Sequence, residues 1–431
     1  MKSAECYRDY NELSAHWSVD PPMFEEQLQS AVLSSSLPHR ILSPGECQSE
    51  RNQKCRLCLA ADITYEQETR VKTQALQKFW REHFPDVSLQ PLVPSPMGRG
   101  YRTVTKRKAF RRLTGTTLGL IDPAESREGG SFTVVRCVIE PEGHTAIYEM
   151  ISNALTSPHT KPFAEKLNYV VIKGNYTEFS IIFNVEKITP LLVTTANTIS
   201  KSLTRKFDSI TGVFLYEDDS DGRYYLGANS DRQTLRKLFG KPDIFQRILG
   251  RGFLFSPLAF SQINLALVDE LAMKAIELLQ PHNDCTMYDL YCGHGLFGLL
   301  VAEKVKSVVG IEMSASAVQS AIANARRQRI SNARFLRNDL TEESVQVSLK
   351  KLTRDDIVLL DPPRNGVADG VVEYVAAKRP ARVLHLFCNI DLMPKEIKRW
   401  TDNGYAIAAA VPFDMFPGTS TMEVLVLFQP S

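Results

Sequence analysis

TMYDLYCGHGLFGLL, residues 286–300, is the stretch that decides the fold of the C-terminal part of this chain. Its apolar start predicts a strand, which runs through Gly293-His294-Gly295 into a helical pattern. Glycine lets the backbone turn sharply and approach a ligand, while N–H groups at the start of a helix can point at it. About twenty residues on, a second apolar run ends in Glu312, an acid placed to accept hydrogen bonds from ribose hydroxyls. The stretch therefore predicts a nucleoside-binding βαβ unit.

Five further apolar runs extend this pattern toward the end of the chain. We expect strands at residues 286–291, 307–312, 333–337, 356–361, 383–388, 405–411 and 422–428. They predict a doubly wound α/β domain over residues 251–431, whose last two strands form an antiparallel pair at the sheet edge because only a short loop joins them. An open sheet binds ligands at the carboxyl ends of its strands. The polar residues expected at this edge are Asp289, Glu312, Asp339, Asp361 and Cys388, with Glu423 at the start of the last strand.

The glycine loop fits two kinds of cofactor. Its spacing matches the G-x-G-x-x-G fingerprint of dinucleotide-binding proteins, so an NAD enzyme is one interpretation. The acids Asp289, Glu312 and Asp339 favour S-adenosylmethionine (SAM), because carboxylates suit a cationic sulfonium that carries ribose and adenine groups. A pyrophosphate, in contrast, prefers an uncluttered helix N-terminus. We therefore expect SAM.

Three features near the predicted strand ends can carry chemistry. Two prolines make the loop DPPRNG, residues 361–366, rigid and aim the Asp361 carboxylate into the site. Amino-group methyltransferases use a related loop with an aromatic residue where Arg364 stands. Cys388 is either core packing or a nucleophile with a depressed pKa. Glu423 enters an apolar strand, where burial would raise its pKa and suit it to proton transfer; alternatively, it caps the strand against solvent.

The N-terminal half contains a cysteine pattern that suggests a metal site. Cys47, Cys55 and Cys58 have the spacing C-x7-C-x2-C, and Cys137 is a candidate for a fourth ligand. Four thiolates suit zinc or an iron–sulfur cluster, and the spacing does not choose between them. Unpaired thiols in the core are the alternative. A helical pattern begins near Thr64, directly after this cluster.

Residues 97–112, MGRGYRTVTKRKAFRR, form the strongest basic run. From Tyr101 onward, rough alternation suggests a strand with its charges largely on one face, where phosphates could bind, while Tyr101 and Phe110 could stack on bases. A solvated charged face is the alternative. Strand-like and helical runs alternate from 130 to 250, which indicates an α+β domain over residues 47–250. We assign no function to residues 1–46.

Composition is that of an ordinary globular protein, with 43% hydrophobic and 23% charged residues in a chain of 431 and a net charge of only +2. Nucleic-acid binding therefore needs a local basic patch. We expect a cytoplasmic monomer without a membrane segment, because the start lacks an apolar signal region and no run reaches spanning length. In that setting the eight cysteines serve as thiols, metal ligands or catalysts rather than disulfides.

The motifs and their order resemble the SAM-dependent RNA uracil-5 (m5U) methyltransferase family over residues 47–431. They are the three-cysteine cluster followed by Tyr65 and Gln67, RGYR at 99–102, Cys137 in CVIEP, FSQIN at 260–264, DLYCGHG, DPPRNG, FCN at 387–389, and DMFPGTSTMEVLVLF at 414–428. The resemblance implies a class I SAM-methyltransferase sheet, which is a doubly wound α/β fold, behind an N-terminal α+β domain that carries a cluster held by four cysteines.

It also implies the site. Cys388 would be the nucleophile and Glu423 the base. SAM would be bound, or the uracil oriented, by Gln262, Tyr291, Glu312, Asp339 and Asp361. A [4Fe–4S] cluster would be held by Cys47, Cys55, Cys58 and Cys137, as in the branch that modifies 23S rRNA. The expected partner is RNA, 23S rRNA ahead of tRNA. The alternatives are an amino-group methyltransferase built on the DPPR loop and a non-catalytic RNA-binding protein. Three departures from the family pattern are Leu296, Phe387 and Ile390.

Overall fold

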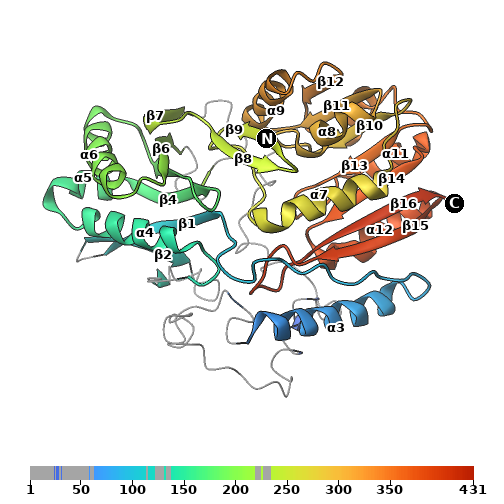
Figure 1. Cartoon of the computed structure of the whole chain (residues 1–431), viewed down its shortest axis with the longest axis horizontal. Helices are drawn as coiled ribbons and strands as arrows, with labels where there is room; N and C mark the ends of the chain where they lie inside the picture. The colour runs from blue at the N-terminus through green and yellow to red at the C-terminus, as the bar shows by residue number, and fades with distance from the viewer. Residues whose placement is uncertain are drawn as a thin grey trace.

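The computed structural model describes residues 24, 26–28, 31, 58, 63–112, 115–121, 131–132, 137–218, 225–226 and 234–431. Within them lie two seven-stranded sheets and one two-stranded hairpin. The first sheet belongs to the N-terminal half and the second to the C-terminal half, and Figure 1 shows them side by side. The hairpin pairs β8 (Ile244–Ile248) with β9 (Arg251–Phe255). The boundary that we expected at residues 250 and 251 falls in the turn of this hairpin.

The first sheet is mostly antiparallel, and its only parallel pair among the described strands is β5 with β6. Its strand order is β3 (Ser131–Phe132), β2 (Gly115–Ile121), β1 (Val104–Arg112), β4 (Leu167–Gly174), β5 (Phe179–Val185), β6 (Ile210–Glu217) and β7 (Thr234–Gly240). Helices α4 (Glu142–Leu155), α5 (Lys161–Ala164) and α6 (Pro190–Lys206) pack their apolar residues on one face of it. This is the α+β arrangement that the alternating runs predicted.

The second sheet confirms the predicted doubly wound domain. Its strand order is β12 (Ala333–Arg337), β11 (Ser307–Glu312), β10 (Thr286–Leu290), β13 (Ile357–Leu360), β14 (Arg382–Phe387), β16 (Glu423–Pro430) and β15 (Tyr405–Phe413). The first five strands are parallel to one another, and β16 is antiparallel to both β14 and β15. The central strands are buried and apolar because helices cover both faces. The expected antiparallel pair at the edge is therefore present.

Helices on the two faces of the second sheet belong to two separate cores. One core contains residues of α7 (Leu265–Leu279), α8 (Leu296–Val301) and α9 (Ala315–Arg327). The other contains residues of α10 (Glu342–Ser348), α11 (Val371–Lys378), α12 (Met393–Asp402) and α3 (Tyr65–His83). Short 3-10 turns occur at Pro158–Thr160, Ala302–Lys304 and Ile390–Leu392.

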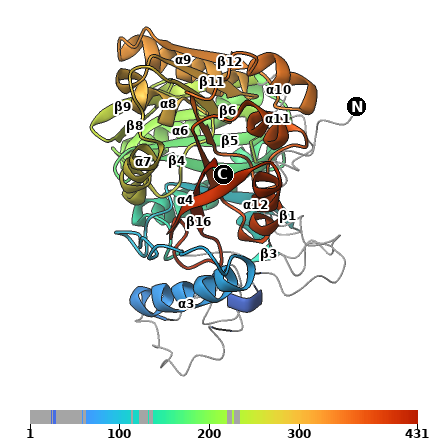
Figure 2. The ribbon, with the colours of Figure 1, turned by 90° about the vertical axis from the view of Figure 1, so that its right-hand side faces the viewer.

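Helix α3 lies against the C-terminal sheet, although its sequence belongs to the N-terminal half (Figure 2). Thr64 caps it with a reciprocal capping box to Gln67, at the start that the helical pattern predicted. The chain then runs along β15, where the N–H groups of Gln90 and Val93 donate to Ala410 and Pro412 carbonyls, both at 2.9 Å. The free edge of β15 is thereby covered by a segment from far earlier in the chain.

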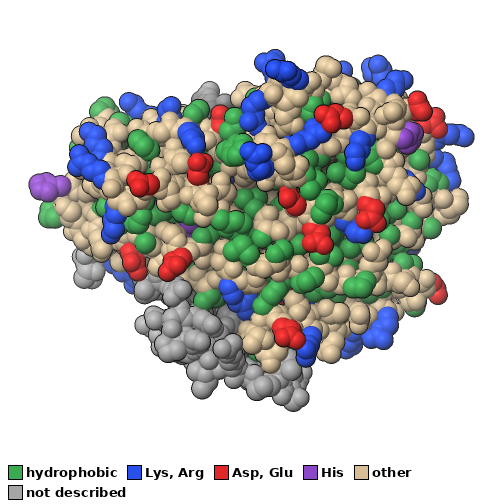
Figure 3. All heavy atoms as spheres, viewed as in Figure 1, with side chains coloured by type: hydrophobic (Ala, Val, Ile, Leu, Met, Phe, Trp, Pro, Cys, Tyr) green, Lys and Arg blue, Asp and Glu red, His purple; other side chains and the backbone are tan. Residues whose placement is uncertain are grey.

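The surface shows no dominant charge on the face seen in Figure 3, where acidic and basic side chains are mixed. This agrees with the small net charge of +2. Among the helices that the structure describes, none combines the length and the apolar character that crossing a membrane requires.

Candidate active site

The glycine loop after β10 is held by two acids, the buried Asp289 and the partly exposed Glu312. Asp289 accepts a hydrogen bond from the Gly298 N–H at 2.9 Å, and Glu312 accepts one from the Gly293 N–H at 3.1 Å. Gly293 and Gly295 have φ angles of 54° and 83°, a region that favours glycine. Each carboxylate oxygen offers two lone pairs, so Glu312 can still accept a ribose hydroxyl as predicted. The loop is thus a preformed cradle at the carboxyl end of β10 and β11.

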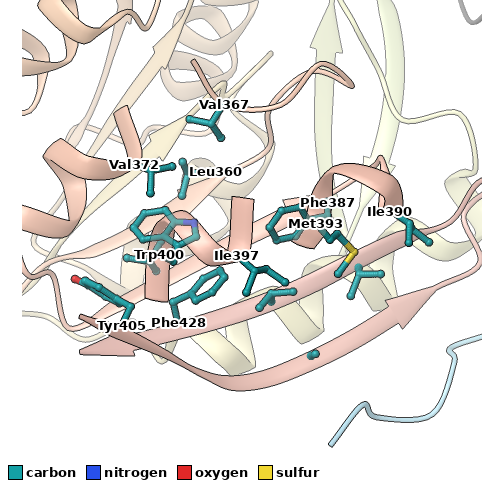
Figure 4. Packing of buried hydrophobic residues seen from close by; sticks show 14 of the residues in the cluster. Leu360, Val367, Val372, Phe387, Ile390, Met393, Ile397, Trp400, Tyr405 and Phe428 are labelled. Carbon is teal, nitrogen blue, oxygen red and sulfur yellow. The ribbon is translucent and has the colours of Figure 1, made fainter. Parts of the chain in front are cut away.

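The three departures from the family pattern all lie in apolar cores. Phe387 and Ile390 pack among the residues of the cluster shown in Figure 4, with 3% and 5% of their surface exposed. Leu296 is also 5% exposed and packs in the core on the opposite face of the sheet. At these three positions the chain therefore has apolar packing behind the site.

The predicted site residues come together at one edge of the second sheet. Tyr291, Asp361 and Cys388 each directly follow a parallel strand, Glu312 ends β11, and Asp339 lies two residues beyond β12. Glu423 begins β16 and reaches the same edge because that strand is antiparallel. Gln262 lies in the loop before α7 and is 6% exposed. Topology therefore brings Tyr291, Glu312, Asp339, Asp361, Cys388 and Glu423 to one edge of the sheet.

Burial and mutual repulsion raise the pKa values of three acids of this edge, Asp289, Glu312 and Asp361. Burial raises the pKa of Asp289 to about 7, and it raises the pKa of Glu312 as well. The pKa of Asp361 lies well above its usual range, first because of burial and then because of Glu423, Asp289 and Glu312. A cation placed among these carboxylates would relieve that repulsion. The site is electrostatically suited to a positively charged ligand.

Cys388 differs from the sequence-based expectation of a depressed pKa. Burial raises the pKa of its thiol to about 12; Arg364 opposes this rise, and the nearby Glu423 and Asp361 add to it. The Sγ atom lies 3.7 Å from the Pro362 carbonyl oxygen, to which the thiol donates. Of the two interpretations, the depressed pKa is not found, because strand position reveals neither how deeply the sulfur is buried nor which acids lie near it. In this arrangement Cys388 is a thiol at neutral pH.

Glu423 meets the expectation of a buried acid with a raised pKa. Its side chain is 4% exposed, and burial raises its pKa to about 7, with Arg364 opposing the rise. Its Oε2 atom is buried and has no hydrogen-bond partner among the described residues. A group that is half ionised near neutral pH can take up and release a proton at working pH.

Arg364 is the cation that links Cys388 and Glu423, and the sequence did not identify it as functional. Its guanidinium acts to lower the pKa of both residues against the effect of burial. Its place after Asp361-Pro362-Pro363, where amino-group methyltransferases carry an aromatic residue, was the available signal.

A pocket opens beside Cys388, and one of the residues that line it comes from a region without a sequence-based assignment. Arg364 and Thr421 form parts of its wall, together with Phe24 from the N-terminal region. The Phe24 N–H donates to Asp391 at 2.5 Å. Residues 1–46 had no expected function, so the contribution of Phe24 was missed because no local pattern relates it to the strand ends.

The predicted cluster ligands are only partly within the described residues. Cys47 and Cys55 lie outside them. Cys58 and Cys137 come from separate segments to the same region: a Cβ atom on Gly418 would lie 4.0 Å from Cys58 Sγ and 3.2 Å from Ile139, two residues after Cys137. In the part of the chain that the structure describes, no group of three or more His, Cys, Asp or Glu residues could hold a metal ion.

The basic run is less available to RNA than its composition suggests. It does form a strand, but Arg107 lies on its buried side and pairs with Glu140 through two hydrogen bonds of 2.8 and 2.7 Å. Tyr101 is fully buried and cannot stack on a base. Lys106 and Lys108 lie on the other side of β1, half-buried. The predicted alternation is confirmed, but the partner that neutralises Arg107 lies 33 residues away in sequence.

Comparisons with known proteins show what the chain is similar to. Residues 246–430 match the family model described as tRNA (Uracil-5-)-methyltransferase. An uncharacterized RNA methyltransferase of Clostridium tetani is 27% identical over 406 residues, which cover 90% of this chain and 84% of that protein. One of Caldanaerobacter subterraneus subsp. tengcongensis is 26% identical over 391 residues, 88% of this chain and 83% of that protein.

A solved structure shares the fold over most of the chain. It is the Pyrococcus abyssi tRNA (uracil-54, C5)-methyltransferase in complex with S-adenosyl-L-homocysteine, with a TM-score of 0.64, 18% identity, and coverage of 92% of this chain and 87% of that one. The chain is thus similar to RNA methyltransferases over most of its length, and its residues 246–430 match the uracil-5-methyltransferase family model. The NAD interpretation finds no support among them.

Proposed function

We propose that this protein is an RNA methyltransferase that methylates carbon 5 of a uridine in 23S rRNA, with SAM as the methyl donor. The observation that carries the proposal is the convergence of a thiol, a cation and a buried acid at the edge of the sheet that also carries the glycine loop. Cys388 and Glu423 serve covalent uracil chemistry, and Arg364 acts on both. Neither Cys388 nor Glu423 has a role in a simple amino-group transfer.

The residues divide the reaction between them. The Cys388 thiolate adds to carbon 6 of the uracil, and the electron pair displaced from the 5,6 double bond makes carbon 5 nucleophilic. SAM, when bound, supplies the electrophilic methyl group that carbon 5 takes up. Glu423 then removes the proton from carbon 5, and the returning electron pair expels the thiolate of Cys388. The uridine must leave its base stack to reach these groups.

The raised pKa of Cys388 ties thiolate formation to ligand binding. Asp361 and Glu423 contribute to that rise. A cationic sulfonium beside Asp361 offsets the contribution of that carboxylate to the pKa of Cys388. We therefore propose that Cys388 becomes a thiolate only in the loaded enzyme, which protects it from reaction in the absence of substrate.

For SAM we propose the residues already gathered at the edge. Glu312 would accept hydrogen bonds from the ribose, and Asp361, with Asp289 behind it, would face the sulfonium charge. Gln262, Tyr291 and Asp339 complete the proposed set. The crowding of acids with raised pKa values is the feature of this structure that fits a cationic ligand.

We also propose that Cys47, Cys55, Cys58 and Cys137 hold a [4Fe–4S] cluster. The approach of Cys58 toward the segment that carries Cys137 supports it. When bound, the cluster would tie these segments together. Iron and acid-labile sulfide should be found in equal amounts in protein purified without oxygen, and Cys58→Ala should lose both. Stoichiometric zinc without sulfide would refute the cluster.

The decisive test uses RNA that carries 5-fluorouridine, because fluorine cannot leave as a proton does and the covalent adduct persists. Wild-type protein with SAM should form the adduct, Cys388→Ala should not, and Cys285→Ala should behave as wild type because Cys285 is buried away from the edge. Methyl transfer without an adduct, retained in Cys388→Ala, would instead indicate an amino-group methyltransferase.

The second candidate substrate is tRNA, which the family description and the name of the Pyrococcus abyssi enzyme favour. The two are separated by measuring m5U in 23S rRNA and in bulk tRNA from cells that lack this chain. Loss confined to 23S rRNA supports the proposal, and loss confined to tRNA replaces it by the second candidate.

A further inference from the structure

Three buried charged residues and the partly exposed Arg99 form a cluster where α3 meets the loop before β16. Lys72 Nζ lies 2.8 Å from Glu68 Oε1 and 2.9 Å from Asp414 Oδ1, and Arg99 Nη1 lies 2.9 Å from Glu68 Oε2. The side chains of Glu68, Lys72 and Asp414 are at most 1% exposed. We call these four residues the α3 ion cluster. With two acids and two bases, it is balanced in charge, which explains how it can be buried.

The α3 ion cluster also grips the backbone of the loop that joins β15 to β16. Lys72 Nζ donates to the Phe416 carbonyl oxygen at 3.3 Å, and the Gly418 N–H donates to Glu68. The same Phe416 oxygen accepts hydrogen bonds from the N–H and the hydroxyl of Thr419 at 3.1 and 2.9 Å. Lys72 therefore fixes a tight turn just before Glu423.

The ring of Phe416 connects this turn to Arg364 in the candidate active site. The Arg364 guanidinium lies over that ring, 5.9 Å from its centre. On the far side of the turn, the Thr421 N–H donates to the Thr419 hydroxyl at 3.2 Å, and Thr421 lines the pocket beside Cys388. A continuous path of contacts thus runs from helix α3 to the cation that acts on Cys388 and Glu423.

We propose that Lys72 is a positioning residue, which holds Arg364 against Cys388 and Glu423 through the Phe416 turn. Its importance for methyl transfer rests on the proposed function, but its effect on the Cys388 thiol does not. A merely structural cluster would hold α3 on the sheet and leave the reactivity of Cys388 unchanged.

The test measures the alkylation rate of Cys388 by iodoacetamide between about pH 7 and 10, resolved by peptide mapping, without RNA or SAM. Loss of the Arg364 contact raises the pKa of Cys388, and a rise of about one pKa unit lowers the thiolate fraction about tenfold. Lys72→Met should therefore alkylate about tenfold more slowly, with its pH profile displaced upward. Lys78→Met on the same helix is the control, because Lys78 is 66% exposed and should match wild type.

Two further variants keep the test decisive if Lys72→Met fails to fold. Lys72→Met/Asp414→Asn restores the charge balance but not the grip on Phe416, and Phe416→Ala spares the cluster but removes the ring under Arg364. Both should show the same slower alkylation. In an Arg364→Met background, Lys72→Met should add nothing, since both changes remove one contact. Wild-type alkylation in the folded double variant and in Phe416→Ala would overturn the proposal.

The two proposals can fail separately. If wild-type protein forms the 5-fluorouridine adduct while Lys72→Met alkylates normally, the positioning role is wrong and the enzyme assignment stands. If no adduct forms but Lys72→Met slows alkylation, the positioning role stands without the uracil chemistry.

Discussion

Replacing Glu423 by Gln should stabilise the protein in alkaline solution, although it removes the proposed base. The pKa of Glu423 is raised from 4.5 to about 7 by burial. Stability contributed by a group with a raised pKa is present below its unfolded value and is lost as the pH rises through its folded value. At about 1.4 kcal/mol per pKa unit, the carboxylate costs about 3 kcal/mol once fully ionised in the folded protein. Gln has nearly the same shape and no charge to desolvate.

The free energy of unfolding of Glu423→Gln should therefore exceed that of wild type by about 1 kcal/mol at about pH 5 and by about 3 kcal/mol at about pH 8.5. Urea denaturation followed by tryptophan fluorescence measures it, because Trp80 and Trp400 are both buried in the core of this unit. Glu373→Gln is the control of opposite sign, since Arg399 lowers the pKa of Glu373 and its removal should destabilise at neutral pH. A pH-independent difference for Glu423→Gln would refute the assignment of a buried carboxylate that is costly to ionise.

Ligand affinity, packing and RNA binding give three more measurable outcomes. Calorimetry should show SAM binding up to about tenfold more tightly at about pH 8 than at about pH 6, because the acids with pKa values raised to about 7 must ionise to face a cation. The affinity of S-adenosylhomocysteine, which lacks the sulfonium charge, should change less with pH. Equal pH dependence of the two ligands would contradict a sulfonium beside the acids. Gly310→Ala should lower the free energy of unfolding by about 1–3 kcal/mol, because the added Cβ atom would overlap the Phe335 ring and lie 2.9 Å from Cys292 Sγ. An unchanged free energy of unfolding would show that the Phe335 ring can move aside. Phe24→Ala should raise KM for RNA without changing SAM affinity, because Phe24 lines the pocket beside Cys388; Phe79→Leu is the comparison, since it disturbs the 5.6 Å ring contact with Phe24 but not the pocket wall itself.

Much of the second sheet could be predicted because its signals are local. Buried parallel strands are continuous apolar runs, and the glycines of the loop mark the turn after the first of them. The direction of β16 followed from the short loop before it, and that direction placed Glu423 with Cys388. These inferences needed no knowledge of distant partners.

The rest could not be predicted because it depends on partners far along the chain. Glu68 and Lys72 resemble an ordinary exposed i,i+4 pair on a helix, and only Asp414, 342 residues after Lys72, reveals them as buried. The raised pKa of Cys388 likewise depends on how several strand ends pack around one sulfur atom. The sequence alone does not show which polar residues become buried when the chain folds.

The segment at residues 90–93 lies along β15, and this contact limits how the C-terminal half can be separated from the rest of the chain. The family match begins at residue 246, so the recognised module lacks both that segment and α3. A piece cut at that point would carry a sheet with an open edge and an uncovered apolar face, which is a template for aggregation. Shuffling of catalytic modules between genes would therefore fail here unless the early segment travelled along. The early segment therefore completes the sheet of the C-terminal half.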